Sequence, residues 1–371
     1  MMPYLTEKYG NPGSIHQMGT DAAKAVTAAR EQVATFMGAN DPSQIIFTSG
    51  GTEGNNLVFY GIYHELIFRS KYDIIISDIE HDSVHKAAER LRRGDYGMHG
   101  FLLTKILPDK DGIISVKNIL HQSDPEHAGI ISVMSANNEL GTINPVYEIC
   151  KLAHQNGALF HTDAVQASGM YDLQVWKNEY DFTTISSHKI HGPKGVGALY
   201  VKDPKTIDPL ICGGAEQEFG LRGGTENVAG IIGFGKACEL AGADCDLKKQ
   251  NREKVNGFFI QTLIKTLGET DSFYVNGSPP LDFKSINLRF HGVDAETLVL
   301  MLSANGVCVS AGSACRAHES EPSRVLLSIG LTPEEARSSI RVSFSDFNTE
   351  SEAEEAAIIL ARCVKTIQQL K

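Results

Sequence analysis

The sequence predicts an α/β protein with a mainly parallel sheet covered by helices, followed by a smaller α/β unit. Up to about residue 240, short continuous runs rich in Ile and Val alternate with longer stretches of helical periodicity. Such runs are typical of parallel strands that are buried on both faces. A long helical stretch and a new group of strands and helices follow, so we place a domain boundary near Ala241. A chain of 371 residues is also long enough for two domains.

The elements of the first part are predicted from the period of their apolar residues. Residues that recur every three or four positions predict helices over 22–37, 53–68, 84–93 and 146–156. Apolar, β-branched runs predict strands over 44–49, 72–77, 129–135, 158–162, 182–186 and 196–201. Ligands of such sheets bind beyond the carboxyl ends of the strands, so the residues that follow these strands are candidates for a site.

The second part is predicted to contain fewer and shorter strands. A long helical stretch covers 227–266, and further helices are expected over 295–304 and 350–369. Strands are expected over 285–290, 307–309 and 339–344. Cys308 lies between two valines in one of these strands, and we interpret it as a core residue.

The composition argues against several classes of protein. There are 34 basic and 45 acidic residues, a net charge of −11 and no long basic run, which disfavours direct binding of nucleic acid. No apolar stretch approaches the roughly 18 residues that a membrane helix needs, and the first residues do not resemble a signal peptide. The seven cysteines are scattered, without a CxxC spacing. We therefore expect no disulfide framework, no metal site and a cytoplasmic location.

Lys189 stands in the loop SSHKIHGPKG (186–195), directly after a predicted strand. A lysine among small residues at a strand end can be partly desolvated, which favours Schiff-base chemistry. Taken alone, it is better explained as a lysine of a surface loop. The segments that follow other predicted strands make the Schiff-base interpretation the favoured one.

Two further segments follow predicted strands. Asp163, in HTDAVQ (161–166), could keep a pyridine nitrogen protonated, or it could simply cap a helix. The segment TSGGTEGNN (48–56) lies at a strand-to-helix turn. Its glycines and the free N–H groups of the helix suit a phosphate, to which Thr52 adds a hydroxyl. An ordinary capped turn is the alternative interpretation.

With EHDSV (80–84) and ANNELGT (136–142), these motifs resemble in order and spacing the cysteine desulfurases of the NifS/IscS type (group I). These are fold-type I, pyridoxal 5′-phosphate-dependent enzymes of the class V aminotransferase group. The resemblance runs from about Tyr9 to the C-terminus. It implies a large domain over 13–240 with a mainly parallel, mixed seven-stranded sheet. It also implies a small domain formed by 1–12 and 241–371, and a homodimer.

The resemblance implies a role for each matched residue. Lys189 would hold the cofactor as a Schiff base and move protons, and Asp163 would pair with the pyridinium nitrogen. His81 would stack on the ring and assist proton transfer. The other implied cofactor contacts are Gly51, Thr52, Asn138, Gln166, Ser186, His188 and, toward the partner subunit, Thr225.

Cys315 lies in the segment SAGSACRAHESEP (310–322), whose small residues and lack of periodicity are typical of a loop. The nearby Arg316 and His318 favour its thiolate, which is the nucleophilic form. The resemblance makes Cys315 the residue that accepts sulfur. An incidental exposed thiol is the alternative.

Arg341 lies in the strand-like segment SSIRVSF (338–344). It matches the family's arginine for the substrate carboxylate, which a guanidinium binds as a two-bond fork. Asn138 would bind the same carboxylate. A surface strand arginine is the alternative.

The implied reaction removes sulfur from L-cysteine and gives L-alanine and a persulfide on Cys315, which passes to a protein acceptor. A selenocysteine lyase or another class V aminotransferase-like enzyme stays open as an alternative, and a non-catalytic scaffold for sulfur transfer is less favoured. An aminotransferase has no need of a loop thiol. The combination of Lys189, Asp163, His81, Cys315 and Arg341 argues against a scaffold.

Overall fold

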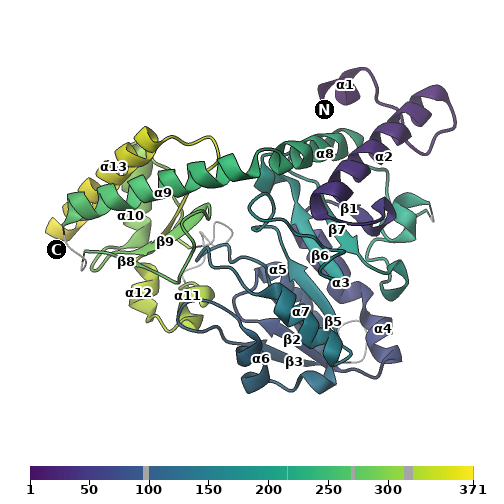
Figure 1. The fold of residues 1–371 in the computed structure, drawn as a ribbon, viewed down its shortest axis with the longest axis horizontal. Coiled ribbons are helices and arrows are strands. Elements are labelled where there is room, and N and C mark those ends of the chain that lie inside the picture. Colours follow the sequence, from purple (N-terminus) through teal and green to yellow (C-terminus); the bar gives the residue numbers. More distant parts are fainter. Residues whose placement is uncertain (95–99, 215, 269–271, 313–320, 371) are drawn as a thin grey trace. The chain divides into compact units, whose positions relative to one another are not determined.

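The computed structural model describes residues 1–94, 100–214, 216–268, 272–312 and 321–370, and the chain forms two compact units (Figure 1). The first unit comprises Met1–Ile106, Ser115–Ala136 and Asn144–Ala243, and the second comprises Leu107–Ile114, Asn137–Ile143 and Asp244–Lys371. The division after Ala243 lies close to the expected boundary. Residues 1–12 belong to the first unit and not to the smaller one, because α1 (Met2–Thr6) packs against α8 (Val228–Gly242).

The first unit is built on a mixed seven-stranded sheet with the order β1-β7-β6-β5-β4-β2-β3. Its strands are β1 (Ile45–Thr48), β2 (Asp73–Ser77), β3 (Leu102–Ile106), β4 (Ala128–Ser132), β5 (Leu159–Asp163), β6 (Phe182–Ser186) and β7 (Gly197–Val201). β7 runs antiparallel to β1 and β6, whereas the pairs from β6 to β3 are parallel. The expected mainly parallel, mixed sheet is confirmed.

Helices cover this sheet mostly in the places that the apolar periodicity predicts, but the helix expected over 53–68 is divided into two, and the helix over Val116–Gln122 was not predicted. The helices are α2 (Gln17–Met37), α3 (Gly51–Gly61), α4 (Tyr63–Phe68), α5 (Asp82–Arg93), α6 (Val116–Gln122), α7 (Val146–Gln155) and α8. Contacts join α3 to β5, β6 and β7, α5 to β2 and β3, and α7 to β4 and β5 (Figure 1). Every residue of β1, β2, β4, β5, β6 and β7 is buried, which is why these strands read as continuous apolar runs. β1 and β3 are the edge strands, and only in β3 are most residues not buried.

His161 is a fully buried histidine on β5. Its Nδ1 lies 2.8 Å from Ser132 Oγ, and its Nε2 lies 3.2 Å from Thr184 Oγ1. Burial lowers the pKa of His161 from 6.5 to about 3. Below pH 6.5 the unfolded chain therefore binds a proton that the folded chain refuses, so the stability that this ring supports is present above pH 6.5 and is lost as the pH falls toward 3.

We expect His161→Gln to flatten the acid dependence of stability. For one titrating group the free energy of unfolding should fall by about 1.4 kcal/mol per pH unit in this window, and the variant should lose that share of the slope. Urea unfolding of the wild type and the variant between pH 6.5 and 4.5 measures the difference. The exposed His121 offers a control, since His121→Gln should leave the slope unchanged. Equal slopes for wild type and His161→Gln would contradict the assignment.

The second unit contains a three-stranded antiparallel sheet with the order β10-β9-β8. Its strands are β8 (Tyr274–Val275), β9 (Ser285–Arg289) and β10 (Ser339–Ser343), and its helices are α9 (Cys245–Leu267), α10 (Ala295–Ala304), α11 (Arg324–Ser328), α12 (Pro333–Arg337) and α13 (Glu350–Gln369). The apolar faces of α9, α10, α13, β9 and β10 form one core that includes Phe259, Leu288 and Leu360. Among the described residues, no helix is long and apolar enough to cross a membrane.

Three expectations for this part are corrected, and the first is the strand over 307–309, because these residues form no strand. The helical stretch over 227–266 is two helices, α8 and α9, because Asp244 adopts a left-handed backbone between them with φ 53°. Cys308 is exposed and is not a core residue. The flanking Val307 and Val309 are the side chains that pack on the core, and side chains alternate in extended backbone, so Cys308 is directed away from it.

Candidate functional site

The parallel strands of the first unit bring several predicted site residues to one edge of the sheet. Asp163 is the last residue of β5, Ser186 is the last residue of β6, and Gly51 begins the helix that follows β1. β1, β5 and β6 run in the same direction, so their carboxyl ends lie at the same edge. This edge is where a parallel α/β sheet binds its ligand.

A cradle for an anion lies at the start of α3. Gly50 adopts φ 150°, which favours glycine, and no described side chain caps the helix. A Cβ on residue 51 would lie only 2.8 Å from Val165 Cγ2, so the close approach of this turn to the sheet needs glycine. The free helix N–H groups lie beside Ser186, because a Cβ on Gly50 would be 3.8 Å from Ser186 Oγ. Such a set of donors fits a phosphate.

His188 and Thr52 belong to the same region. His188 Nδ1 lies 2.9 Å from Ser186 Oγ, which orients both side chains. Thr52 is exposed in the first turn of α3, so its hydroxyl is accessible to a ligand. The two side chains add polar groups to a turn whose backbone already suits an anion.

Asp163 is a buried carboxylate, with 4% of its surface exposed. One oxygen, Oδ1, accepts a hydrogen bond from Val165 N at 3.0 Å, as in an ordinary capped turn. The other, Oδ2, accepts from Asn55 Nδ2 at 2.7 Å. A buried acceptor of this kind fits the protonated nitrogen of a pyridine ring.

Lys189, Gln166 and His81 are three further residues of the first unit that the sequence predicts to belong to the site. Lys189 lies in the short helix η4 (Ser187–Ile190) immediately after β6 and is half-buried. Gln166 is half-buried three residues beyond the end of β5. His81 precedes α5, and its Nδ1 accepts a hydrogen bond from Ser83 N at 3.1 Å.

The second unit holds the two residues predicted to bind a carboxylate. Arg341 Nη1 donates to the carbonyl oxygen of Asn138 at 2.9 Å. The next strand supports this arrangement, since Asn287 lies opposite Arg341 in the sheet and its Nδ2 donates to the carbonyl of Glu139 at 3.3 Å. Side chains of two adjacent strands thus hold two successive carbonyls of the segment that carries Asn138.

The same unit anchors both ends of the segment that contains Cys315. Cys315, with Arg316 and His318, lies outside the described residues. Before it, Ser310 and Arg341 exchange both backbone hydrogen bonds, at 3.1 and 2.7 Å. After it, Ser323 Oγ donates to Glu139 Oε2 at 2.5 Å.

We expect Asn287→Ala to weaken binding of the substrate carboxylate. The change removes the bond to the Glu139 carbonyl, so Asn138 should be held less firmly and KM should rise about fivefold, as the loss of about 1 kcal/mol would give. Steady-state kinetics with the substrate that the resemblance implies measures the effect. Asn276→Ala is the matched control: it also removes a bond within this buried network, 2.7 Å to Asn287 Oδ1, but leaves the bond from Asn287 to Glu139. An equal rise in KM for both variants would contradict the proposal.

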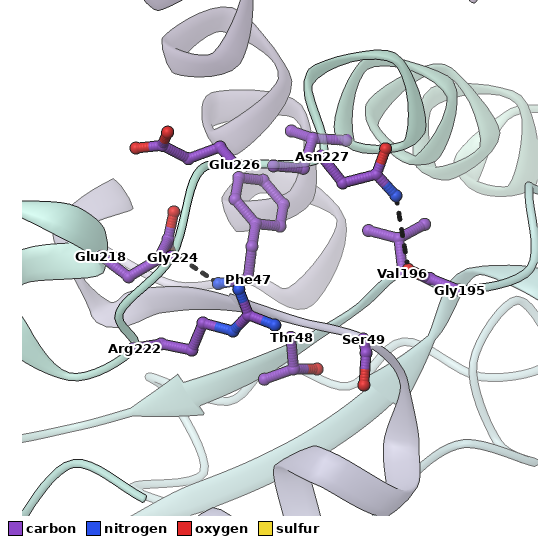
Figure 2. Close-up of a pocket in the computed structure, with 11 residues that line it drawn as sticks. Phe47, Thr48, Ser49, Gly195, Val196, Glu218, Arg222, Gly224, Glu226 and Asn227 are labelled. Atoms are coloured by element: carbon purple, nitrogen blue, oxygen red, sulfur yellow. Dashed lines mark hydrogen bonds between the residues drawn. The ribbon is translucent and has the colours of Figure 1, made fainter. Parts of the chain in front are cut away.

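A separate small pocket lies beside the anion cradle (Figure 2). Its walls are Phe47, Thr48, Ser49, Gly195, Val196, Glu218, Arg222, Gly224, Glu226, Asn227 and Ile231. Two of its charged side chains form ion pairs, since Glu218 pairs with Arg30 at 2.7 Å and Arg222 pairs with Glu53 at 2.9 Å. Burial alone would raise the pKa of Glu53, but hydrogen bonds from Arg222 and Ser49 outweigh it and hold the pKa below its usual value.

Thr225 lies between two residues of this pocket wall and is exposed. None of Lys189, Asp163 and His81 lines the pocket, so the structure does not bring Thr225 into the set of residues at the strand ends. Its predicted role, which requires a partner subunit, stays a prediction.

The described cysteines differ sharply in accessibility. Cys150, Cys238 and Cys363 are buried, and burial raises the pKa of each thiol. Cys212, Cys245 and Cys308 are exposed. Among the described residues, no group of three or more His, Cys, Asp or Glu side chains is suited to a metal ion.

Sequence reasoning missed four residues that support these groups. Asn55 and Ser83 lie within motifs already singled out, TSGGTEGNN and EHDSV, and Glu139 lies within ANNELGT. These residues could have been found from the sequence as polar side chains within those motifs, and in the structure they are buried. Asn287 carried no signal beyond being a polar residue in an apolar strand.

Comparisons with known proteins agree along the whole chain. A family model described as aminotransferase class-V matches residues 1–355. The cysteine desulfurase IscS of Dictyoglomus turgidum is 39% identical over 371 residues, which is 100% of this chain and 91% of that protein. The solved structure of a NifS-like protein is 32% identical, with a TM-score of 0.87 over 98% of this chain and 94% of that chain. That of SspA in complex with cysteine is also 32% identical, with a TM-score of 0.79 over 94% of each chain.

Proposed function

Because the chain belongs to the cysteine desulfurases of the aminotransferase class-V family, we propose that it passes the sulfur of L-cysteine to Cys315 while Lys189 holds the cofactor. The cofactor of this family is pyridoxal 5′-phosphate, and it is the cofactor of this chain. The observation that carries the proposal is the set of groups at the carboxyl edge of the first sheet. A phosphate cradle, a buried carboxylate and a lysine follow three strands that run in the same direction.

The residues present fit each end of this cofactor. The N-terminus of α3, with Gly51 and Thr52, and the pair of Ser186 and His188 would hold the phosphate. Asp163 would face the ring nitrogen, and Gln166 would bind the ring hydroxyl. When bound, the cofactor supplies an electron-accepting ring that stabilises negative charge at the substrate's α-carbon.

The chain's own residues would then carry out three tasks. Arg341 and Asn138 bind the carboxylate of cysteine and orient it. Lys189 removes the α-proton and returns protons to the carbon skeleton, with assistance from His81. The thiolate of Cys315 forms a bond to the substrate's sulfur as the carbon–sulfur bond breaks. Both electrons of that bond stay with the carbon, which is protonated and leaves as alanine.

We propose a homodimer as the working form and a protein as the final sulfur acceptor. Large apolar side chains near the start of the chain support the dimer, because Met2, Leu5, Tyr9 and Ile15 are exposed, Ile15 completely. The exposed Thr225 is likewise accessible to a second copy. The acidic net charge of −11 favours a protein acceptor over direct transfer to nucleic acid.

One experiment separates this function from its alternatives. The loaded enzyme is supplied in turn with cysteine, with selenocysteine, and with cysteine plus a 2-oxo acid, and alanine is measured together with the mass of the protein. A desulfurase forms alanine from cysteine and gains sulfur on the protein. Turnover of selenocysteine alone would identify a lyase, and consumption of the 2-oxo acid would identify an aminotransferase.

A further inference from the structure

His81 and Asp163 are joined by a chain of short hydrogen bonds that neither the fold nor the predicted roles require. Asn55 Nδ2 lies 2.7 Å from Asp163 Oδ2 and 2.8 Å from Ser83 Oγ. Ser83 Oγ in turn lies 2.8 Å from His81 Nδ1. Asn55 is 1% exposed and Ser83 is 7% exposed, so water does not compete for these bonds. Three elements supply the links, namely α3, α5 and the end of β5.

The chemistry of the groups fixes the direction of each bond. A carboxylate only accepts, so the atom of Asn55 that faces Asp163 is the amide nitrogen. That nitrogen also donates to Ser83 Oγ, which leaves the hydroxyl proton of Ser83 for His81 Nδ1. The backbone N–H of Ser83 donates to the same Nδ1 at 3.1 Å. Two donors therefore meet at Nδ1, and the neutral ring carries its proton on Nε2.

The orientation of the Asn55 amide leaves a buried oxygen unpaired in the part of the chain that the structure describes, which destabilises the fold and suggests that the orientation serves a function. Its Oδ1 is buried and has no hydrogen-bond partner among the described residues. Most buried polar atoms in proteins are paired, and an unpaired acceptor destabilises the fold. In this orientation Oδ1 accepts no hydrogen bond from the described residues, whereas Nδ2 lies between Asp163 and Ser83 and donates to both.

We propose that Asn55 and Ser83 are positioning residues that set the tautomer of His81 and tie its ring to Asp163. This inference rests on the proposed function, because it takes His81 and Asp163 as the two groups that contact the cofactor ring. The relay, by which we mean the hydrogen bonds from His81 through Ser83 and Asn55 to Asp163, fixes the position of His81 relative to Asp163. It also leaves Nε2 of His81 as the nitrogen that can donate a proton. Neither Asn55 nor Ser83 needs to touch the substrate.

The test uses the apoprotein, so it does not depend on turnover. Histidine is labelled with ¹⁵N, and long-range ¹H–¹⁵N correlation reports the tautomer of each ring. The signal of His81 is identified by its loss in His81→Gln. We expect the Nε2–H tautomer in the wild type and in Ser83→Thr, which keeps the hydroxyl. In Ser83→Ala the ratio of Nε2–H to Nδ1–H should fall about fivefold, as expected for the loss of one neutral hydrogen bond.

The chain offers a matched control in a second serine–histidine pair of the same length. Ser132 Oγ lies 2.8 Å from His161 Nδ1, so Ser132→Ala should move the signal of His161 and leave that of His81 unchanged. An Nδ1–H tautomer in the wild type, or a His81 signal that does not respond to Ser83→Ala, would overturn the proposal.

A second readout tests the link to Asp163 in the loaded enzyme. Asn55→Leu removes the amide that joins Asp163 to Ser83, and we expect the pH midpoint of the cofactor's absorption band to shift, whereas Asn56→Leu on the same helix should leave it in place. An unchanged midpoint in Asn55→Leu would exclude the link. The two proposals fail separately: if the tautomer responds as expected but cysteine gives no alanine, the relay stands and the proposed function falls.

Discussion

Lys189→Ala is expected to reduce alanine release from cysteine by about 10³-fold or more, because we propose that the residue supplies both the covalent attachment of the cofactor and a positioned base. The variant should also lack the absorption of a protein-linked Schiff base when pyridoxal phosphate is added. Binding of the phosphate group should survive in part, since α3 and Ser186 remain in place. Absorbance spectra during titration with the cofactor, followed by an alanine assay, measure both effects.

Two variants make this result specific to the amine at position 189. Lys189→Arg keeps a positive charge but cannot form the Schiff base at neutral pH, so it should behave like the alanine variant. Lys194→Ala removes an exposed lysine from the same loop and should retain the wild-type spectrum and rate. A Schiff-base spectrum that persists in Lys189→Ala and disappears in Lys194→Ala would show that Lys194, and not Lys189, holds the cofactor.

The large sheet was predictable from the sequence because every residue of six of its seven strands is buried. β1, β2, β4, β5, β6 and β7 all read as short apolar runs, and each lies within two residues of its predicted start. β3 escaped detection for the opposite reason. Residues 102–105 of this edge strand are not buried, and its sequence, LLTKI, has neither a continuous apolar run nor strict alternation.

The site was predictable to the extent that it depends on chain order. Residues that follow parallel strands must share one edge of the sheet, which brings Gly51, Asp163 and Ser186 to the same side. Contacts between side chains of different elements do not follow from order alone. The bond from Asn55 to Asp163 spans 108 positions along the chain, and it exists only because α3 packs across β5 and β6.

The error at Cys308 shows the limit of local pattern. Two flanking valines suggest a buried strand, yet the same alternation that buries Val307 and Val309 exposes the cysteine between them. That exposure makes Cys308 a useful control, because its accessible thiol lies seven positions before Cys315 along the chain.

Cys315→Ala is expected to separate cofactor chemistry from sulfur transfer. The variant should bind pyridoxal phosphate with the wild-type spectrum, because the phosphate cradle, Asp163 and Lys189 are untouched. Formation of alanine from cysteine should fall by about 10³-fold or more, since removal of the nucleophile from a covalent mechanism costs at least that much. Mass spectrometry after brief treatment with cysteine should find one added sulfur on the wild type and none on Cys315→Ala.

The other cysteines decide how that result is interpreted. Cys150, Cys238 and Cys363 are buried and their raised pKa values disfavour the thiolate, so they are poor rivals. Cys308 is accessible but lies outside the segment bounded by Ser310 and Ser323. These two residues contact Glu139 and Arg341, and Arg341 is proposed to bind the substrate carboxylate. Cys308→Ala should therefore still acquire the sulfur and release alanine at the wild-type rate. Sulfur found on Cys308 instead, with Cys315→Ala still active, would mean that exposure rather than anchoring of the segment selects the acceptor.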